Sequence, residues 1–506
     1  MFISPVLSLS DLLGEPYIKS VADASMALGV SVPVDAFEPV DFYPSEKQIQ
    51  NDILTERVGR QIIPPLSVSV KGAGTNSFNH SFNIHASPLT GLGCFRVGED
   101  GRLYLLGKSE HYHTPLGHRF NGYNLIDKAR RLGIVNPTHN NTRGYITRLT
   151  EMRLIQAVNG LNDNNSEALN KILNSCEPKI LNRVINLETG SLAAEAGIKM
   201  MLNRFYKLDG SCAQPKYHGK TPVFFVMADQ NGGFGANYHG TNVFIQTFRG
   251  LWPDFYKNAE NSGLYKTVPV KINDTEDFRE KIYTYNRNQY KTAGFLHEII
   301  LMNYGGIRLT PEYLTEAYKL CHETDTPVMA DEIQSCMWYG GMFLFRQYGL
   351  SPDFVVIGKG FPGGEYPASK IITTAEMDTL DQFGALVTNG QEELASLSYL
   401  ITMAFVQANG ALIQNLGEYF QNKLSEISRK NSDIIIKTEG LGHLAALHFN
   451  SVDKAAGFAK KLNALCIDAS AQVYKRDCPP AVLLKPPVIS SEKILDFIAD
   501  SIEKLI

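Results

Sequence analysis

The stretch VMADEIQSCMWYGGMFLFRQYGLSPDFVVIGKGFPGG (residues 328–364) decides the fold. It contains two short apolar runs, Val328–Ala330 and Phe354–Ile357, whose β-branched and aromatic residues indicate buried strands. Asp331 directly follows the first run, and Lys359 follows the second after one glycine. Because ligands in open α/β sheets bind beyond the carboxyl ends of strands, both charged residues lie where a bound cofactor could meet them.

Asp331 and Lys359 together favour a cofactor with a cationic ring. A buried carboxylate is costly without a cationic partner, and a protonated pyridine nitrogen is one such partner. Gly358 and Gly360 let a flat ligand approach Lys359, and partial burial would lower the lysine pKa and make it a better nucleophile. The plainer alternatives are a turn cap for Asp331 and a surface loop for Lys359, but opposite charges at consecutive strand ends favour the cofactor site.

Outward from this stretch, short apolar runs alternate with amphipathic helices between about residues 165 and 400. This alternation predicts an α/β domain with a doubly wound, mainly parallel sheet. Val223–Met227 and Phe295–Met302 are two further expected strands. Residues 311–321 have helical spacing, with Pro311 in the first turn, where its missing N–H matters little.

The flanks of this domain have a different character. Residues 391–430 predict helices that break near Asn409-Gly410. The last hundred residues alternate strands with helices, as in a smaller α+β lobe; the segments are Ile434–Ile436, Leu444–Phe449, Val482–Lys485 and the helix Ser490–Leu505. We therefore divide the chain into an appended segment without an assigned role (1–95), the N-terminal part of the small lobe (96–164), a large cofactor-binding domain (165–400) and a C-terminal small domain (401–506).

Composition narrows the class of protein. The chain has 506 residues, 44% of them hydrophobic, which is enough for several packed lobes. A net charge of −4 and a pI of about 6.3 give no electrostatic footprint for nucleic acid. No stretch approaches the roughly 18–20 uninterrupted apolar residues of a membrane helix, and the first residues lack the basic region of a signal peptide. The seven cysteines are scattered singly, a pattern typical of reduced thiols in the cytoplasm. The sequence therefore predicts a cytoplasmic enzyme that binds neither nucleic acid nor membrane.

Residues 331–364 resemble the signature of class III, or omega-type, aminotransferases, which are pyridoxal-phosphate enzymes of fold type I. The resemblance covers roughly residues 100–506. It implies that Lys359 forms the Schiff base with pyridoxal 5'-phosphate and shuttles the proton. It also implies that Asp331 pairs with the pyridine nitrogen and that Gln334 hydrogen-bonds the phenolic oxygen.

Two further segments resemble the phosphate-binding parts of this family. Residues 189–196, TGSLAAEA, are similar to the phosphate cup, with Gly190 and Ser191 opening a helix whose free N–H groups and dipole favour an anion. An ordinary capped helix, with Ser191 as its cap, is the alternative. Thr388, in Thr388-Asn389-Gly390, resembles the threonine that reaches the phosphate in the neighbouring subunit, which implies a homodimer with a shared active site.

Other matches are positional or depart from the family pattern. Tyr238-His239-Gly240 resembles the motif in which Tyr238 would lie on the cofactor face with His239 beside it, although a buried tyrosine and a satisfied histidine explain it equally. Glu298 resembles the glutamate of a Glu-Pro motif, with Ile299 in place of the proline. Leu192 stands where the family usually has an acidic residue.

Lys485, in LLKPP, stands where the family usually carries arginine. Arginine offers a planar fork to a carboxylate and lysine only a point charge, so the usual carboxylate recognition is in doubt. Arg143 and Arg148 are candidate replacements, and a solvated loop is the alternative for both.

Two other signals are set aside. His111, His113 and His118 have a spacing that suits zinc, but Gly117-His118 resembles a Gly-His motif of the family and no convincing carboxylate or cysteine ligand lies nearby, so we expect no metal. Gly107-Lys108-Ser109 match the last three residues of a phosphate-binding loop motif, but Arg102 occupies the position of the first glycine of that motif.

The expected reaction is ping-pong amino transfer from an amino acid or amine donor to a keto acid or aldehyde acceptor. A cofactor-dependent aminomutase, racemase or decarboxylase would use Lys359 and Asp331 equally well. A non-catalytic protein of the same fold is a more distant alternative, because such a chain would have no reason to keep the whole set of cofactor residues.

Overall fold

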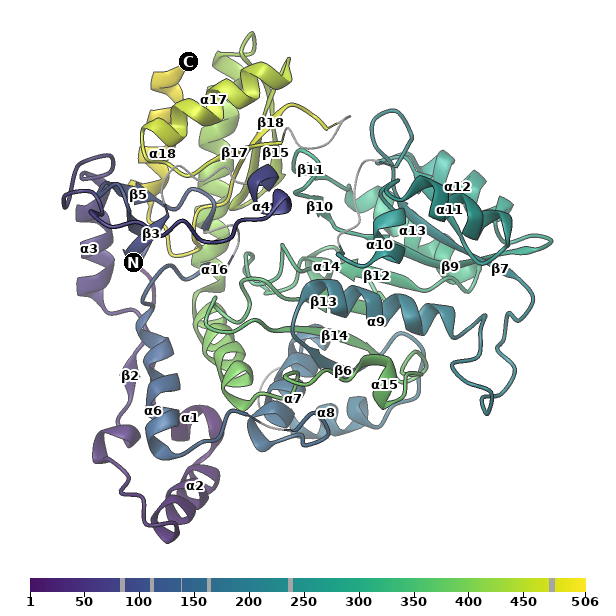
Figure 1. Cartoon of the computed structure of the whole chain (residues 1–506), viewed down its shortest axis with the longest axis horizontal. Coiled ribbons are helices and arrows are strands. Elements are labelled where there is room, and N and C mark those ends of the chain that lie inside the picture. The colour runs from purple at the N-terminus through teal and green to yellow at the C-terminus, as the bar shows by residue number, and fades with distance from the viewer. Residues whose placement is uncertain (82–86, 110–112, 138, 162–164, 235–239, 473–477) are drawn as a thin grey trace.

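A computed structural model describes residues 1–81, 87–109, 113–137, 139–161, 165–234, 240–472 and 478–506. Figure 1 shows a large lobe beside a smaller one that contains both ends of the chain. Helix α16 (Glu393–Lys430) runs along their boundary. The cofactor site predicted from the sequence lies in the large lobe, on the side that faces this boundary.

The large lobe is built on a seven-stranded sheet with the order β6-β14-β13-β12-β9-β7-β8. The strands are β6 (Leu181–Leu187), β7 (Thr221–Met227), β8 (Lys266–Val270), β9 (Tyr290–His297), β12 (Val328–Asp331), β13 (Phe354–Ile357) and β14 (Ser369–Thr374). β14 runs antiparallel to both of its neighbours, and the other adjacent pairs are parallel. The predicted fold class, an α/β fold with a mainly parallel sheet, is confirmed.

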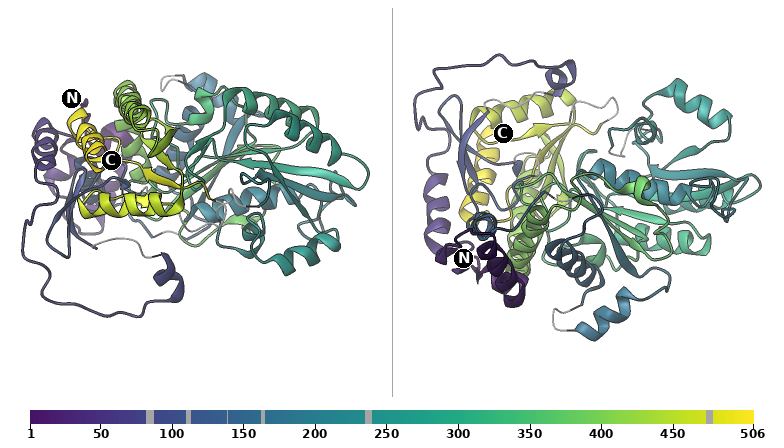
Figure 2. Two further views of the ribbon diagram at one scale, coloured as in Figure 1. Left: turned by 90° about the horizontal axis from the view of Figure 1, so that it is seen from above. Right: turned by 60° about the horizontal axis from the view of Figure 1, so that its bottom comes forward.

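Helices cover both faces of this sheet (Figure 2). Successive residues of a strand point to opposite faces, so Val355 and Val356 of β13 enter different apolar cores. Helix α9 (Gly190–Leu202) packs on β13 and β14, and α7 (Tyr145–Asn159) packs on β6. The other helices of this lobe are α8 (Ser166–Leu173), α10 (Val243–Thr247), α11 (Pro253–Asn261), α12 (Thr275–Thr284), α13 (Pro311–Glu323), α14 (Leu344–Gln347) and α15 (Gln382–Ala385).

The strand expected at Phe295–Met302 is wrong in extent. β9 ends at His297, and the chain then leaves the large sheet at Glu298. Residues Ile300–Leu301 form β10, which pairs antiparallel with β11 (Ile307–Arg308) in a separate ribbon. The apolar residues on both sides of His297-Glu298 are buried, so the composition of the run does not reveal the change of sheet.

The break expected near Asn409-Gly410 is also wrong, because α16 is continuous through both residues. Both serve tertiary contacts instead. A Cβ atom on Gly410 would overlap the carbonyl oxygen of Gly340, so the glycine permits close packing. The Asn409 side chain accepts a hydrogen bond from the Ile3 N–H at 2.7 Å and donates to the Ile3 carbonyl oxygen at 2.8 Å.

By length and composition, α16 is one helix among the described residues that could cross a membrane. However, 72% of its most apolar window is buried within the protein. Its apolar surface is therefore largely covered by the rest of the chain, as in a core helix.

The small lobe combines segments from both ends of the chain. An antiparallel sheet has the order β15-β16-β18-β17, and a second one has the order β3-β4-β5. The two segments meet where Leu105 forms a parallel bridge with Ile467. The elements are β3 (Pro88–Leu92), β4 (Phe95–Gly98), β5 (Leu103–Leu105), β15 (Ile435–Leu441), β16 (Leu444–Phe449), β17 (Ser470–Ala471), β18 (Ala481–Leu484), α17 (Val452–Ala464) and α18 (Glu492–Leu505).

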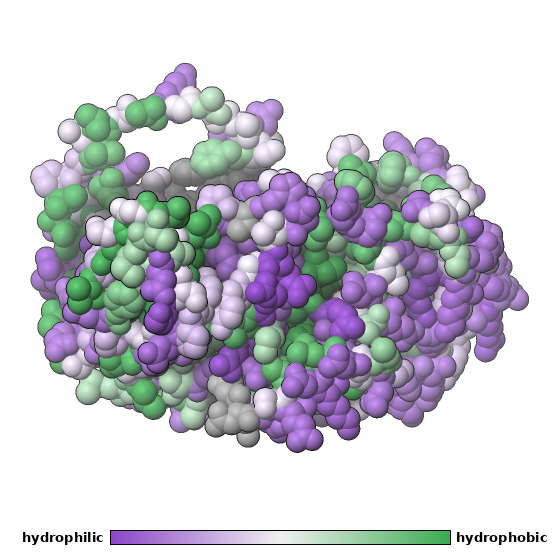
Figure 3. Space-filling model, turned by 90° about the horizontal axis from the view of Figure 1, so that it is seen from below, coloured by the Kyte–Doolittle hydropathy of each residue, from purple (hydrophilic) through white to green (hydrophobic). Residues whose placement is uncertain are grey.

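The N-terminal segment is partly integrated into this lobe and partly exposed. Phe2, Leu9 and Phe42 are buried in the main core, close to α6 and α16. Residues 63–79, here named the strap, are exposed throughout and arch away from the surface (Figure 3). The elements of this region are β1 (Val6–Leu7), α1 (Leu9–Leu13), α2 (Glu15–Ala27), η1 (Val34–Phe37), β2 (Val40–Asp41), α3 (Ser45–Thr55), α4 (Asn76–Ser81), η2 (Asn121–Tyr123) and α6 (Asn124–Leu132).

Candidate active site

Two adjacent parallel strands bring the predicted acid and lysine to one edge of the sheet. Asp331 is the last residue of β12 and pairs with Val356 of β13. Lys359 follows β13 after Gly358. Because the strands are parallel neighbours, both side chains leave the sheet at the carboxyl edge, where open α/β sheets bind ligands.

Asp331 is a buried carboxylate that is 4% exposed. Its Oδ1 accepts a hydrogen bond from the Ile333 N–H at 3.0 Å. Burial raises the pKa of Asp331, whereas this hydrogen bond and the positive charge of Lys359 oppose the shift. A carboxylate in this position is stabilised by a cation beside it, as a pyridinium nitrogen would be.

Lys359 occupies a strained turn. Its φ of +46° lies in the left-handed region, which costs a residue with a side chain about 1–3 kcal/mol and is commonest at functional sites. Burial lowers the pKa of Lys359, and the nearby carboxylates of Glu298 and Asp331 partly oppose this. The lysine can therefore lose its proton more readily than a surface lysine.

Gln334 connects Lys359 to Glu298. The Lys359 Nζ donates to the Gln334 Oε1 at 3.4 Å. The Gln334 Nε2 lies 3.3 and 3.2 Å from the two carboxylate oxygens of Glu298 and donates to them. Glu298 thus fixes the orientation of the amide, with its carbonyl oxygen toward the lysine. The structure therefore brings four of the predicted site residues into one cluster: Glu298, Asp331, Gln334 and Lys359.

The predicted phosphate cup lies against the lysine turn. A Cβ atom on Gly358 would lie 3.7 Å from the backbone nitrogen of Gly190, and a Cβ on Gly190 would overlap the side chain of Ile333. The N-cap of α9 is Thr189, whose hydroxyl accepts from the Leu192 N–H at 3.4 Å, so the alternative in which Ser191 caps the helix is wrong.

This cap leaves donors available at the start of α9. In the described part of the chain, the N–H groups of Gly190 and Ser191 and the Ser191 hydroxyl donate to no protein group. A helix N-terminus with open donors suits a phosphate group. Together with the buried acid and the lysine, it matches the three functional parts of pyridoxal phosphate: the pyridine nitrogen, the aldehyde and the phosphate. The residues present therefore fit this cofactor.

Other predicted residues lie outside this cluster or outside the described residues. Tyr238 and His239, and also His111 of the set-aside zinc spacing, are not among the described residues. Thr388 lies in the exposed loop after α15. Arg143 and Arg148 line a groove beside β6, and the lining of that groove includes neither Lys359 nor Asp331.

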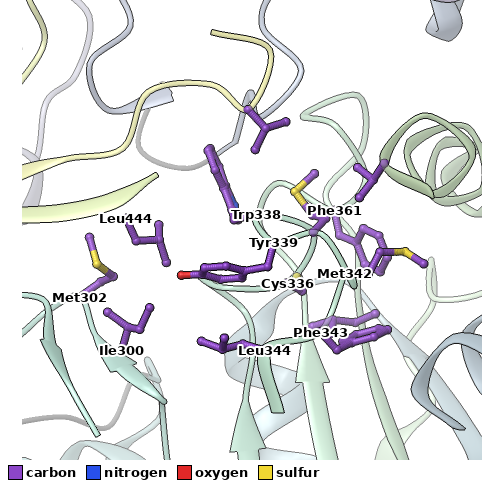
Figure 4. Close-up of a cluster of buried hydrophobic side chains, with 14 of the residues drawn as sticks. Ile300, Met302, Cys336, Trp338, Tyr339, Met342, Phe343, Leu344, Phe361 and Leu444 are labelled. Atoms are coloured by element: carbon purple, nitrogen blue, oxygen red, sulfur yellow. The ribbon is translucent and has the colours of Figure 1, made fainter. Parts of the chain in front are cut away.

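Lys485 is completely buried and approaches the cluster from the small lobe. Its Nζ donates to the carbonyl oxygen of Gln334 and lies 4.1 Å from the ring centre of Trp338. Figure 4 shows Trp338 and Tyr339 in the apolar cluster between the two lobes, where the Tyr339 hydroxyl donates to the Leu441 carbonyl oxygen at 3.1 Å. Sequence reasoning missed Trp338, because nothing in the linker after Gln334 marks which aromatic residue turns toward the site.

A buried acid on β12, a lysine in a strained turn on β13 and an open helix N-terminus define a pyridoxal-phosphate-dependent enzyme of fold type I. The chain belongs to the class III aminotransferase family, whose sequence model ("Aminotransferase class-III") matches residues 83–506. The predicted family and cofactor are confirmed, and with the family come aminotransferase activity and amino-donor and keto-acceptor substrates.

Individual relatives are distant. The chain is 24% identical over 324 residues to acetylornithine aminotransferase of Caldanaerobacter subterraneus subsp. tengcongensis, covering 63% of this chain and 76% of the relative. It is 27% identical over 340 residues to ornithine aminotransferase of Emericella nidulans, covering 64% and 70%. The crystal structure of adenosylmethionine-8-amino-7-oxononanoate aminotransferase from Methanocaldococcus jannaschii aligns with a TM-score of 0.65 at 19% identity, covering 90% and 98%. At this identity the structural likeness shows the fold alone.

Proposed function

We propose that this aminotransferase binds its cofactor through Lys359, with Asp331 at the pyridine nitrogen, Gln334 at the phenolic oxygen, and Gly190 and Ser191 at the phosphate. The observation that carries this proposal is the pairing of β12 with β13, which sets Asp331 and Lys359 at one sheet edge. Bound pyridoxal phosphate supplies the electron sink that stabilises negative charge at the substrate carbon.

Lys359 is the residue that moves protons at Nζ. Its lowered pKa makes the neutral amine accessible, and that amine can take a proton from the substrate carbon and return it elsewhere. The Gln334 amide, held by Glu298, accepts a hydrogen bond from Nζ and so orients it. The roles are therefore divided, since Lys359 moves the proton and Gln334 and Glu298 position it.

The homodimer with a shared site is part of this proposal, and the loop after α15 supports it. Thr388 is exposed at the tip of this loop, and Phe383 on α15 is 86% exposed. The base of the loop is fixed, because a Cβ on Gly390 would overlap the Asn186 carbonyl oxygen and the Thr147 hydroxyl donates to the Gln391 carbonyl oxygen at 3.3 Å. A rigid loop with an exposed aromatic residue is suited to contact a second copy of the chain.

We also propose that the enzyme acts in the cytoplasm. None of the seven cysteines forms a disulfide, and five of them are buried. Buried thiols that form no disulfide are typical of proteins in a reducing compartment. Fractionation of cells that express the tagged protein tests this, and recovery with the membrane or secreted fraction would contradict it.

The cofactor assignment is tested by the absorbance spectrum of the purified protein and of Lys359→Ala, each supplied with pyridoxal phosphate. The parent should show a visible band of lysine-bound cofactor that borohydride abolishes, and the variant should lack it because no other residue replaces the amine. Lys454→Met, a change of an exposed lysine on α17, serves as the control and should keep the band.

Transfer is separated from the other reactions of this cofactor by adding an amino donor alone. Conversion of the bound cofactor to pyridoxamine phosphate, one per site, is expected of an aminotransferase. An aminomutase, racemase or decarboxylase would process the donor without this stoichiometric conversion. A colourless protein that stays colourless with added pyridoxal phosphate would refute the assignment of Lys359.

A further inference from the structure

Lys108 lies beside the site on a loop that is bound to Lys485. The Lys485 N–H donates to the Gly107 carbonyl oxygen at 2.6 Å, and the Ser109 hydroxyl donates to the Lys485 carbonyl oxygen at 2.6 Å. Both chain neighbours of Lys108 are thus attached to the residue whose own ammonium group reaches Gln334. This places Lys108 on the small-lobe side of the site, opposite the sheet edge.

The ammonium group of Lys108 has no partner in the described part of the chain. The structure gives it neither a hydrogen bond nor an ion pair. Asp468, the described acid whose charge acts on Lys108, is already engaged by Arg96, whose Nε and Nη2 donate to the two carboxylate oxygens at 3.1 and 3.0 Å. Burial lowers the pKa of Lys108 to about 8; Asp468 partly opposes this, and the charge of Lys359 adds to it. Lys108 is therefore close enough to Lys359 for the two charges to interact.

The other groups on this side of the site are occupied or uncharged. Lys485 is committed to the Gln334 carbonyl oxygen and the Trp338 ring, which projects from the apolar cluster toward the C-terminal segment (Figure 4). Burial lowers the pKa of His113, and Lys359 and Lys485 lower it further, so its imidazole is neutral near pH 7. The carboxylate of Glu298, an acid near Lys359, accepts hydrogen bonds from the Gln334 side chain. Among the described residues, the small-lobe side of the site thus presents one uncompensated cation, that of Lys108.

We propose that Lys108 is an anion-binding subsite that holds a carboxylate of the amino donor and of the acceptor. This inference rests on the proposed function, because the carboxylate must arrive on a substrate that reacts at Lys359. A half-buried ammonium group without a partner among the described residues is unfavourable in the ligand-free enzyme and is relieved by an anionic ligand. The same charge repels a second ammonium group, so the enzyme selects amino acids over simple amines and diamines.

The matched probes are 5-aminopentanoate, pentylamine and 1,5-diaminopentane, which share a reacting amine and a carbon chain and differ at the far end. The rate at which each converts the bound cofactor is measured for the parent, Lys108→Met, Lys108→Arg and the control Lys454→Met. A hydrogen bond to a charged group predicts that Lys108→Met reacts about 10- to 100-fold more slowly with 5-aminopentanoate and about equally with pentylamine. Lys108→Arg should keep most of the preference, and Lys454→Met all of it.

Two readouts do not depend on turnover. Glutarate, a dicarboxylate without an amine, should bind the parent in calorimetric titration and bind Lys108→Met about tenfold or more weakly. The melting temperature of Lys108→Met should be unchanged or higher, since a half-buried charge without a partner has been removed. A lower melting temperature with an unchanged substrate preference would make Lys108 a structural residue and overturn the proposal.

The remaining outcomes are distinguishable. If Lys108→Met binds glutarate normally but has lost affinity for pyridoxal phosphate, the anion held by Lys108 is the cofactor phosphate, and the substrate subsite is refuted. If the parent forms the lysine-bound cofactor but does not distinguish 5-aminopentanoate from pentylamine, the subsite is also refuted. If no variant with Lys359 intact forms the visible band, the proposed function itself fails.

Discussion

Glu332, next to the cofactor acid, is a buried carboxylate with a structural task. It is 1% exposed, and its carboxylate accepts from the Phe345 N–H at 2.7 Å and from the Ser335 hydroxyl. These bonds hold the loop between β12 and α14. The two acids of the DEIQ motif thus have different roles, since Asp331 faces the cofactor site and Glu332 anchors the loop that follows.

Glu332 gives a pH dependence with a definite sign. Burial raises its pKa from 4.5 to about 7. The folded chain therefore holds this proton more tightly than the unfolded chain, and the free energy of unfolding falls as pH rises from about 4.5 through 7. Glu332→Gln should reduce this fall, measured by urea unfolding of the cofactor-free protein at about pH 5 and 8. The exposed Glu426→Gln is the matched control; an equal fall in Glu332→Gln and the parent would contradict the assignment.

At the residue scale, the sequence predicted that Asp331, Gln334 and Lys359 lie together, because they closely follow two recognisable strands. Lys108 could not be identified in the same way. Its role depends on the contacts that its neighbours make with Lys485, and 376 positions separate Ser109 from Lys485 in the sequence. Local spacing suggested only an incomplete phosphate loop, since it contains no information about which charge remains unpaired after folding.

At the scale of elements, α16 shows how a local signal is overridden by packing. Gly410 lowers intrinsic helix stability by about 1 kcal/mol relative to alanine, yet the helix continues because its close contact with Gly340 requires the missing side chain. The strand at Phe295–Met302 was misjudged for a related reason, since the apolar residues on both sides of His297-Glu298 indicate burial and not membership of one sheet. Strands with polar flanks, such as β7 and β13, were predicted almost to the residue.

Gly410→Ala and Gly457→Ala make a matched pair of helical substitutions. Gly457 lies in α17 and has open space where a Cβ would stand, so its replacement should stabilise the protein by about 0.5–1 kcal/mol. Gly410→Ala should destabilise it, because the new atom collides with the Gly340 backbone, which cannot rotate away. Melting temperatures compare the two; a rise in both would show that the contact with Gly340 is loose in solution.

At the scale of the whole molecule, the proposed dimer predicts a joint loss of assembly and cofactor binding. Phe383→Glu places a charge on the exposed aromatic residue beside the Thr388 loop, and the dimer dissociation constant should rise about tenfold or more. Affinity for pyridoxal phosphate should fall with it, since the partner's loop would no longer reach the phosphate. Sedimentation velocity and cofactor titration measure the two effects.

Ile436→Glu is the control for this test, because Ile436 is 51% exposed on the small lobe. It should leave both assembly and cofactor affinity unchanged. A Phe383→Glu protein that remains dimeric and binds the cofactor normally would place the contact between subunits elsewhere.

The bond between Ile3 and Asn409 also sets an order on folding during synthesis. The two residues are separated by 406 positions, so this bond cannot form until most of the chain has left the ribosome. At about 5–20 residues per second, that delay is roughly 20–80 seconds. During this time Phe2 lacks its contact with Phe405 of α16, where the ring centres are 6.0 Å apart, and a chaperone that binds emerging hydrophobic segments would keep this side chain from associating with other chains.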